Sequence, residues 1–274
     1  MIRLGASRLA AVVALACGLA GCFSRAQEAP VDMAVVKADL QAVAGARILF
    51  AHQSVGRNIL EGVQELARQT GVPIRIQQVD GLPPDAGPGL FHTMIGVNGQ
   101  ADTKLDAFAG LLTRPERPSY DLALLKFCYE DLEPGAKGRD GLFQRYAARM
   151  GQVQAARPDL RLVHVSSPLR ADPPGWKTTL KRWLGRETEE DAGNLARNAY
   201  NDALRARFGG APLFDLAAVE STLPDGTRSR FASAQRSVYT LARPYTSDGG
   251  HLNEEGRRRA AAELLHTLAA ALKK

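Results

Sequence analysis

Short apolar runs alternate with longer amphipathic stretches from residue 47 to the end of the chain. Runs of four to eight residues rich in Ile, Leu, Val and Phe predict buried strands. These strands are expected at Arg47–Phe50, Ile74–Val79, Tyr120–Phe127, Leu160–Val165 and Pro212–Leu216. Apolar residues that recur every three or four positions predict helices between the strands. The helices are expected at Val55–Gln69, Thr103–Leu112, Leu142–Ala156, Asn194–Phe208 and Glu254–Leu272.

This alternation predicts an α/β fold. Strands separated by helices pair in parallel, and a parallel sheet needs helices on both of its faces. We therefore expect a three-layer α/β/α sandwich around a five-stranded parallel sheet, with a flavodoxin-like strand order. The Gly- and Pro-rich stretch 81–89 is predicted to be a loop. The domain is expected to span 46–274. The stretch 170–191, which holds Trp176 and Trp183, is expected to be an insertion over the site or a plain surface excursion.

The N-terminal 21 residues have the pattern of an export signal. Arg3 and Arg8 precede an apolar stretch that is too short to cross a bilayer comfortably. The stretch ends in Leu-Ala-Gly-Cys22, which resembles the lipobox of bacterial lipoproteins, in which the cysteine is lipidated. The alternative is an ordinary signal peptide with an incidental cysteine.

The lipobox implies a lipid anchor on the membrane surface rather than a membrane span. We expect residues 1–21 to be the signal peptide and 22–45 to form a lipidated tether and leading helix. Phe23 stands where an aspartate is associated with retention in the inner membrane, so the periplasmic face of the outer membrane is favoured. The expected location is therefore the bacterial cell envelope.

Composition and charge narrow the class of protein. The chain has 274 residues, of which 45% are hydrophobic and 23% charged, as in ordinary globular proteins. Its net charge of +6 includes Arg3 and Arg8 of the signal, and the other positive charges are scattered. No nucleic-acid partner is therefore expected. Once Cys17 leaves and Cys22 carries lipid, Cys128 has no cysteine with which to pair.

Two segments hold candidate catalytic residues. Ser54 follows the first predicted strand, where a helix begins and its N-terminal partial charge favours a developing anion. Asp248 and His251 lie three residues apart in a glycine-bearing turn before the last helix, so the carboxylate can orient the imidazole. The alternative is that Ser54 caps a helix and that Asp248 and His251 are ordinary turn residues.

Together these segments resemble the SGNH (GDSL-like) hydrolases, whose serine follows the first strand and whose D-x-x-H motif precedes the last helix. The stretch Gly96-Val97-Asn98-Gly99 resembles the second block of that family. The resemblance runs from residue 47 to the C-terminus. It implies a flavodoxin-like fold, ester hydrolysis without a cofactor or metal, and an acylated carbohydrate or lipid substrate. It also implies that Ser54 is the nucleophile, His251 the general base, Asp248 its orienting carboxylate, and the N–H groups of Ser54 and Gly99 oxyanion donors.

The sequence departs from that family at two places. The serine motif reads His52-Gln53-Ser54 rather than Gly-Asp-Ser, and Glu130 stands where the third block has an asparagine that donates to the oxyanion. An ionised carboxylate cannot donate a hydrogen bond and repels negative charge. We expect Asn98 or Asn58 to replace that donor, with Gln53, Asn58 and Glu130 lining the pocket. The alternative is a catalytically silent domain that binds envelope polysaccharide or peptidoglycan.

Other chemistry is less well supported by the sequence. His52 and His92 lack the spacing of a metal site, and Cys128 at the end of an apolar strand is typical of a small buried residue. Lys126 lies within the same apolar strand, and a structural ion pair with Glu130 or Asp131 is expected. Trp176 and Trp183 suit either stacking on a sugar ring or apolar anchoring of their segment.

Overall fold

The computed structural model describes residues 31–80, 87–114, 119–233 and 236–273. The predicted signal peptide, Cys22 and most of the tether lie outside these residues. Among the helices that are described, none is long and apolar enough to cross a membrane.

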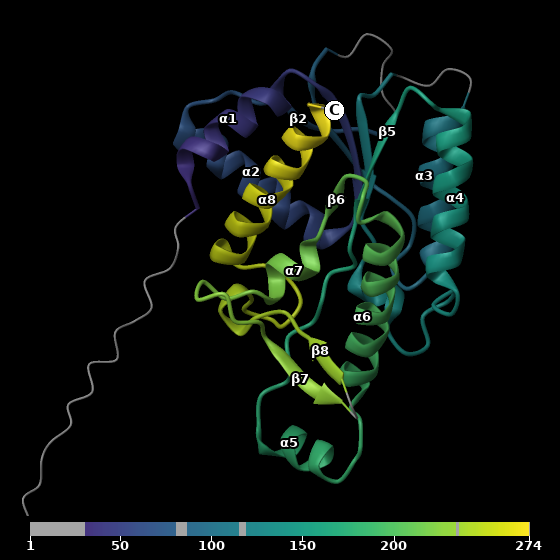
Figure 1. The fold of residues 1–274 in the computed structure, drawn as a ribbon, viewed down its shortest axis with the longest axis vertical. Coiled ribbons are helices and arrows are strands. Elements are labelled where there is room, and N and C mark those ends of the chain that lie inside the picture. The colour runs from purple at the N-terminus through teal and green to yellow at the C-terminus, as the bar shows by residue number, and fades with distance from the viewer. Residues whose placement is uncertain (1–30, 81–86, 115–118, 234–235, 274) are drawn as a thin grey trace, which may run out of the picture.

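A six-stranded parallel sheet forms the centre of the molecule (Figure 1). The strands are β1 (Arg47–His52), β2 (Ile76–Gln78), β3 (Gly89–Met94), β4 (Leu122–Leu125), β5 (Arg161–Val165) and β6 (Leu213–Phe214). Their order is β2-β3-β1-β4-β5-β6. If β2 is set aside as an added edge strand, the remaining order is flavodoxin-like, which confirms the predicted fold class.

The prediction of five strands was wrong by one, because β3 was not recognised. Its sequence begins with Gly89 and is interrupted by His92 and Thr93, so it lacks a continuous apolar run. The strand forms because β1 and β2 hydrogen-bond it from both sides. Pairing with two neighbours outweighs a weak local strand preference.

Side chains alternate along β1 and divide the core into two halves. Ile48 and Phe50 face one apolar cluster with α1 (Met33–Ala44), α2 (Ser54–Thr70) and α8 (Glu254–Leu272). Leu49 and Ala51 face the other, with α3 (Ala101–Thr113), α4 (Leu142–Ala156) and α6 (Glu189–Phe208). Figure 1 shows these two helix layers on opposite sides of the sheet, so the three-layer sandwich is confirmed.

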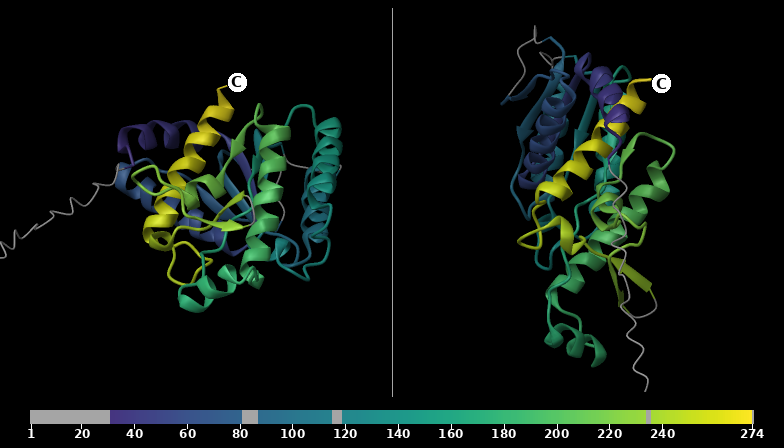
Figure 2. Two further views of the ribbon diagram at one scale, coloured as in Figure 1. Left: turned by 60° about the horizontal axis from the view of Figure 1, so that its bottom comes forward. Right: turned by 90° about the vertical axis from the view of Figure 1, so that its left-hand side faces the viewer.

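The remaining elements gather near the end of the sheet where its strands reach their carboxyl ends. They are the 3-10 turns η1 (Tyr129–Leu132) and η2 (Arg243–Tyr245), the short helices α5 (Trp176–Trp183) and α7 (Leu216–Ser221), and the hairpin of β7 (Arg230–Ser233) and β8 (Arg236–Tyr239). Helix α5 belongs to the predicted insertion 170–191 and projects away from the three layers (Figures 1 and 2).

Candidate active site

Ser54 is the first residue of α2 and comes directly after the carboxyl end of β1. Among the described residues, no group hydrogen-bonds the half-buried Ser54 hydroxyl. The N–H groups in the first turn of a helix have no partner within the helix, and the helix dipole adds positive potential there. Ser54 therefore combines an available hydroxyl with a backbone site that favours an anion.

The side chain of His52 supports the turn that holds Ser54. Its ring is fully buried, and Nδ1 lies 2.7 Å from the carbonyl oxygen of Gln53, so Nδ1 carries the proton and donates it. Nε2 then accepts from Nδ1 of His92 at 3.1 Å. Burial lowers the pKa of His52 to about 3, so the ring stays neutral and serves as a structural support.

Gly56 and Gln53 complete this turn. A Cβ at Gly56 would lie 2.3 Å from Cγ of His52, so only glycine leaves room for the ring. Nε2 of Gln53 donates to the carbonyl oxygens of Ile95 and Gly96, at 2.8 and 3.0 Å. The His-Gln-Ser-Val-Gly sequence thus ties the serine turn to the loop after β3.

Asp248 and His251 form a hydrogen-bonded pair in the turn before α8. Oδ2 of Asp248 lies 2.6 Å from Nδ1 of His251, and Oδ1 accepts the N–H groups of Gly250 and His251, each at 2.8 Å. Partial burial would raise the pKa of Asp248, but these hydrogen bonds outweigh it and hold the pKa well below its usual range. The ionised carboxylate keeps the proton of His251 on Nδ1 and leaves Nε2 free to accept another.

Asn58 links that turn to the helix that begins with Ser54. Its Oδ1 accepts the backbone N–H of Leu252, the residue after His251, at 3.3 Å. Residues four apart lie on one face of a helix, so Ser54 and Asn58 share the face of α2 that meets this turn. Asn58 therefore connects the two segments, which are almost 200 residues apart in the sequence.

Asp131 is a buried hub between the loops that follow β3 and β4. Its carboxylate accepts the N–H groups of Gly99 and Cys128, at 2.9 and 2.7 Å, and pairs with Nζ of Lys104 at 2.6 Å. Neither Lys104 nor Asp131 is exposed. The N–H of Gly99, which the sequence analysis expects to bind the oxyanion, is donated to Asp131 in this arrangement.

The same hub orients the side chain of Asn98. Nζ of Lys104 donates to Oδ1 of Asn98 at 2.9 Å, which turns the Nδ2 amide group away from the lysine. Asn98 is otherwise exposed. A side-chain amide with its oxygen held from behind has its N–H groups available to a ligand.

Glu130 lies beside this loop. Its carbonyl oxygen lies 4.0 Å from where a Cβ on Gly99 would be, and its side chain is half-buried. Among the described residues, its carboxylate has no hydrogen-bond or ion-pair partner. Glu130 is the residue that the sequence comparison places at the asparagine of the third block, so its side chain supplies no amide donor there.

No protein-family model matches the sequence, and the comparison with curated proteins found no match. Solved structures, in contrast, match over most of the chain. A structure described as "Peptidoglycan O-acetylesterase in action" is similar at 11% identity with a TM-score of 0.50, covering 89% of this chain and 97% of that one. The chain has the fold of this esterase structure, as the resemblance to the SGNH hydrolases implies.

Two further matches have lower TM-scores. A GDSL-like lipase from Bacteroides thetaiotaomicron is 14% identical with a TM-score of 0.47, covering 89% of this chain and 98% of that one. A carbohydrate esterase of family 3 from Talaromyces cellulolyticus is 14% identical with a TM-score of 0.46, covering 83% and 97%.

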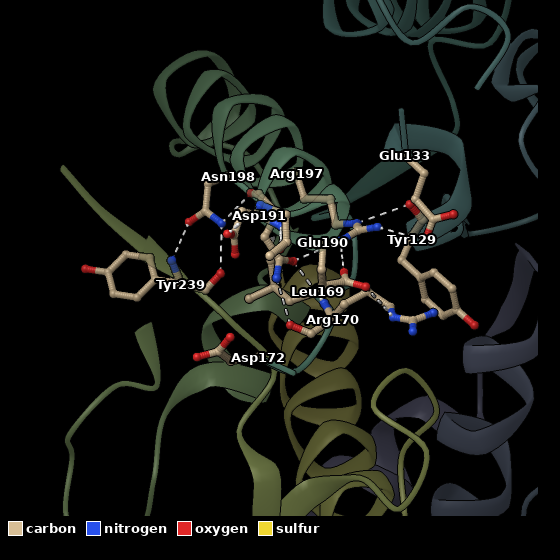
Figure 3. A network of polar contacts seen from close by, with 12 residues as sticks. Tyr129, Glu133, Leu169, Arg170, Asp172, Glu190, Asp191, Arg197, Asn198 and Tyr239 are labelled. Atoms are coloured by element: carbon tan, nitrogen blue, oxygen red, sulfur yellow. Dashed lines mark hydrogen bonds and ion pairs between the residues drawn. The ribbon is translucent and has the colours of Figure 1, made fainter. Parts of the chain in front are cut away.

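The sequence did not reveal a polar network around Tyr129, Arg170, Glu190 and Arg197 (Figure 3). The ring of Tyr129 packs edge-on against His251 at 6.1 Å between centroids. The guanidinium of Arg170 lies over the same ring at 4.9 Å, and buried Arg197 donates to the carbonyl oxygen of Tyr129 at 3.1 Å. Arg197 and Arg170 both pair with Glu190, at 3.0 and 3.4 Å. Helix α6 therefore fixes Tyr129 behind the catalytic candidate.

The sequence analysis did not predict that Arg197 is buried, because a charged residue in an amphipathic helix is expected on the exposed face. Arg197 is buried because α6 packs against η1 in the folded protein. The only local signal was the capping box of Thr188 and Asp191, which begins α6 earlier than predicted and brings Glu190 into the helix.

Two other candidate residues, Cys128 and Lys126, have structural roles. Burial raises the pKa of the Cys128 thiol, which makes it a poor nucleophile. The predicted ion pair of Lys126 was wrong: its Nζ donates to the carbonyl oxygen of Phe127 at 2.9 Å, and burial lowers its pKa to about 8. Lys104 pairs with Asp131 instead.

Within the described residues, no group of three or more His, Cys, Asp or Glu side chains is arranged to hold a metal.

Proposed function

We propose that the protein is a serine esterase in which Ser54, His251 and Asp248 carry the reaction. The observation that carries this proposal is the hydrogen bond of 2.6 Å between Asp248 and His251, in a turn that Asn58 joins to the first turns of α2. The fold and the ionised state of Asp248 support it. The chemistry needs no metal or organic cofactor.

In the first step, Ser54 attacks the acyl carbonyl of an ester. Nε2 of His251 takes the hydroxyl proton, and the ionised Asp248 stabilises the imidazolium that forms. The carbonyl π bond breaks and places a negative charge on the oxygen of the tetrahedral intermediate. His251 then gives its proton to the departing alcohol, which leaves an acyl-enzyme on Ser54.

In the second step, water releases the acyl group. His251 takes a proton from the water, the hydroxide attacks the acyl carbonyl, and the intermediate collapses to a carboxylic acid and free Ser54. The proton held by His251 returns to the Ser54 oxygen.

The oxyanion of both intermediates needs hydrogen-bond donors. We assign the backbone N–H of Ser54 at the N-terminus of α2 and the Nδ2 group of Asn98. Asn98 takes the role that Glu130 cannot fill, and Lys104 holds its amide in the required orientation. Gly99 then serves the loop by binding Asp131.

The decisive experiment uses a fluorophosphonate probe and short p-nitrophenyl esters. The wild type should be labelled on Ser54 and should hydrolyse the esters, and Ser54→Ala should abolish both while the protein stays folded. Ser237→Ala, a change of the same kind at an exposed serine, is the matched control and should leave both intact. Hydrolysis that persists in Ser54→Ala would remove Ser54 from the mechanism.

For substrate and location, we propose an O-acylated carbohydrate or lipid at the bacterial cell envelope. The lipobox supports attachment through a lipidated Cys22, with the domain held at a membrane surface. Cys22→Ser should remove the lipid anchor or leave the protein unprocessed, and mass spectrometry should find acyl chains on Cys22 of the wild type and none on the variant. Wild-type protein without lipid that fractionates as the variant does would contradict the anchor.

A second function is favoured by two features of the oxyanion site. The carboxylate of Glu130 and the engaged N–H of Gly99 both weaken the usual oxyanion site, as expected of a silent domain that binds envelope polysaccharide or peptidoglycan. Such a domain would bind these polymers and show neither labelling nor turnover in the same experiment.

A further inference from the structure

Helix α5 presents an unusual apolar surface. Among the described residues, seven large hydrophobic side chains are exposed, and four of them belong to this short helix and its C-cap. They are Trp176 at 71%, Leu180 at 42%, Trp183 at 80% and Leu184 at 55% exposure. Exposed tryptophans and leucines clustered in one place mark an interaction surface.

The four side chains form one stripe. They lie at positions i, i+4, i+7 and i+8, which is the spacing of a single helix face. The opposite side of the helix holds Arg182, which attaches α5 to the rest of the molecule. Its guanidinium pairs with Asp172 at 2.7 Å and also with Asp191, and it lies over the ring of Phe231 at 4.1 Å. The stripe therefore lies on the side of α5 opposite Arg182. The helix itself projects from the three layers (Figures 1 and 2).

The charge beside the stripe is positive. Lys177 and Lys181 are exposed one turn apart at its edge, Arg186 follows the helix, and α5 contains no carboxylate. Most of the nearby acidic side chains are engaged elsewhere. Asp172 and Asp191 bind Arg182, Glu190 binds Arg197, and Glu187 accepts from Ser233, whereas Glu189 is exposed in the first turn of α6 and is not part of α5. The exposed face thus combines tryptophan, leucine and lysine.

We propose that α5 docks onto an anionic phospholipid surface. Tryptophan rings and leucines enter the boundary between headgroups and acyl chains, while flanking lysines bind the lipid phosphates. The complementary charge distinguishes this partner from a neutral glycan, which would need polar side chains around the tryptophans for its hydroxyl groups. The proposal does not depend on the esterase chemistry.

Docking would also orient the molecule. The N–H of Ala171, at the start of this segment, donates to the carbonyl oxygen of Gly249 at 2.9 Å, one residue from the Asp248–His251 turn. The helix therefore projects from the end of the molecule that carries the candidate active site. A membrane bound by α5 would lie on the same side as Ser54.

The chain has a built-in probe of this proposal, because Trp176 and Trp183 are its only tryptophans. We would mix the full chain carrying Cys22→Ser, which cannot be lipidated, with vesicles of phosphatidylglycerol or of phosphatidylcholine. On phosphatidylglycerol, tryptophan emission should move to shorter wavelength and be quenched by brominated acyl chains. On phosphatidylcholine the change should be much weaker.

Matched charge variants test the lysines. Lys177→Glu with Lys181→Glu should weaken binding to phosphatidylglycerol by roughly 30-fold or more. Lys37→Glu with Lys273→Glu changes the net charge equally at exposed sites outside α5 and should retain near wild-type affinity. Leu180→Ser should reduce the wavelength shift while leaving both tryptophans in place.

Four results would overturn the proposal. Emission that stays unchanged on phosphatidylglycerol would show that α5 does not insert. Equal responses to both lipids, or equal losses in the two charge variants, would remove the lysines from recognition. A response to peptidoglycan fragments but not to vesicles would assign the stripe to a glycan instead.

Discussion

At the scale of single residues, the hydrogen bonds within the site determine which polar groups are available to a substrate. The N–H of Gly99 and the Oδ1 of Asn98 are engaged by Asp131 and Lys104, whereas the amide nitrogen of Asn98 and the carboxylate of Glu130 have no such partner among the described residues. A donor that is already bound contributes nothing to an oxyanion. The two residues without such partners therefore give the sharpest tests.

Asn98→Ala should lower kcat by about 10²-fold, the usual effect of removing one oxyanion donor, with little change in KM. Asn98→Asp separates the two roles of the side chain, because it keeps an oxygen for Lys104 and loses the donor. Steady-state kinetics should show at least as large a loss in Asn98→Asp as in Asn98→Ala, because its carboxylate also repels the oxyanion. If the Asp variant retained wild-type turnover, the Nδ2 group would have no part in the reaction.

Glu130→Asn should raise the acyl-transfer rate by about 10-fold, because it replaces a repelling acceptor with a donor beside the oxyanion. Glu130→Ala removes the charge without adding a donor and should give a smaller gain. Burst kinetics with a p-nitrophenyl ester measure acylation directly. Rates that are unchanged in both variants would mean that Glu130 points away from the reacting atoms.

At the scale of elements, one buried side chain holds the junction of β1 and α2. The ring of buried His52 occupies the space beside Gly56 and holds the carbonyl of Gln53, so strand, turn and helix are fixed together. A change at Gly56 should therefore affect both stability and the position of Ser54.

Gly56→Ala should lower the free energy of unfolding by about 1–3 kcal/mol, the usual effect of overpacking. Gly110→Ala is the matched control, because that helical glycine has open space around it. There alanine should raise stability by about 0.5–1 kcal/mol through helix propensity. Denaturant unfolding of the two variants compares them directly, and equal effects would contradict the close contact with His52.

At the scale of the whole molecule, buried histidines couple stability to pH. Burial lowers the pKa of His164 to about 4, and its Nδ1 lies 2.8 Å from the Tyr146 hydroxyl. The unfolded chain takes up a proton near its ordinary pKa of about 6.5, whereas the folded protein does so only near 4. This contribution to stability is therefore complete above the unfolded pKa and is lost as the pH falls toward 4.

The protein should lose about 2 kcal/mol of stability through His164 between pH 7 and 4.5. His164→Gln should make the decline shallower by that amount, and denaturant unfolding across this range measures it. His266→Gln, at a mostly exposed ring, is the control and should keep the wild-type slope. A wild-type slope in His164→Gln would show that this ring is not kept neutral by the fold.

The sequence by itself determined the layers of the fold, because the apolar positions that recur along each helix and strand are the positions that must be buried against another layer. Helix Leu142–Ala156 and helix Glu254–Leu272 have the predicted bounds, and the α/β class follows from their alternation with strands. The sequence also named Ser54, Asp248 and His251, because their motifs are local and each needs only a turn beside a helix.

Tertiary structure alone decided the features that depend on neighbours distant in the chain. Strand β3 exists because β1 and β2 pair with it, and Asp131 binds Gly99 and Lys104 rather than Lys126 because two loops meet. Buried polar groups must find partners wherever the fold brings them, and local patterns do not encode those partners. For the same reason, the exposed stripe of α5 became visible only once the rest of the chain had packed without it.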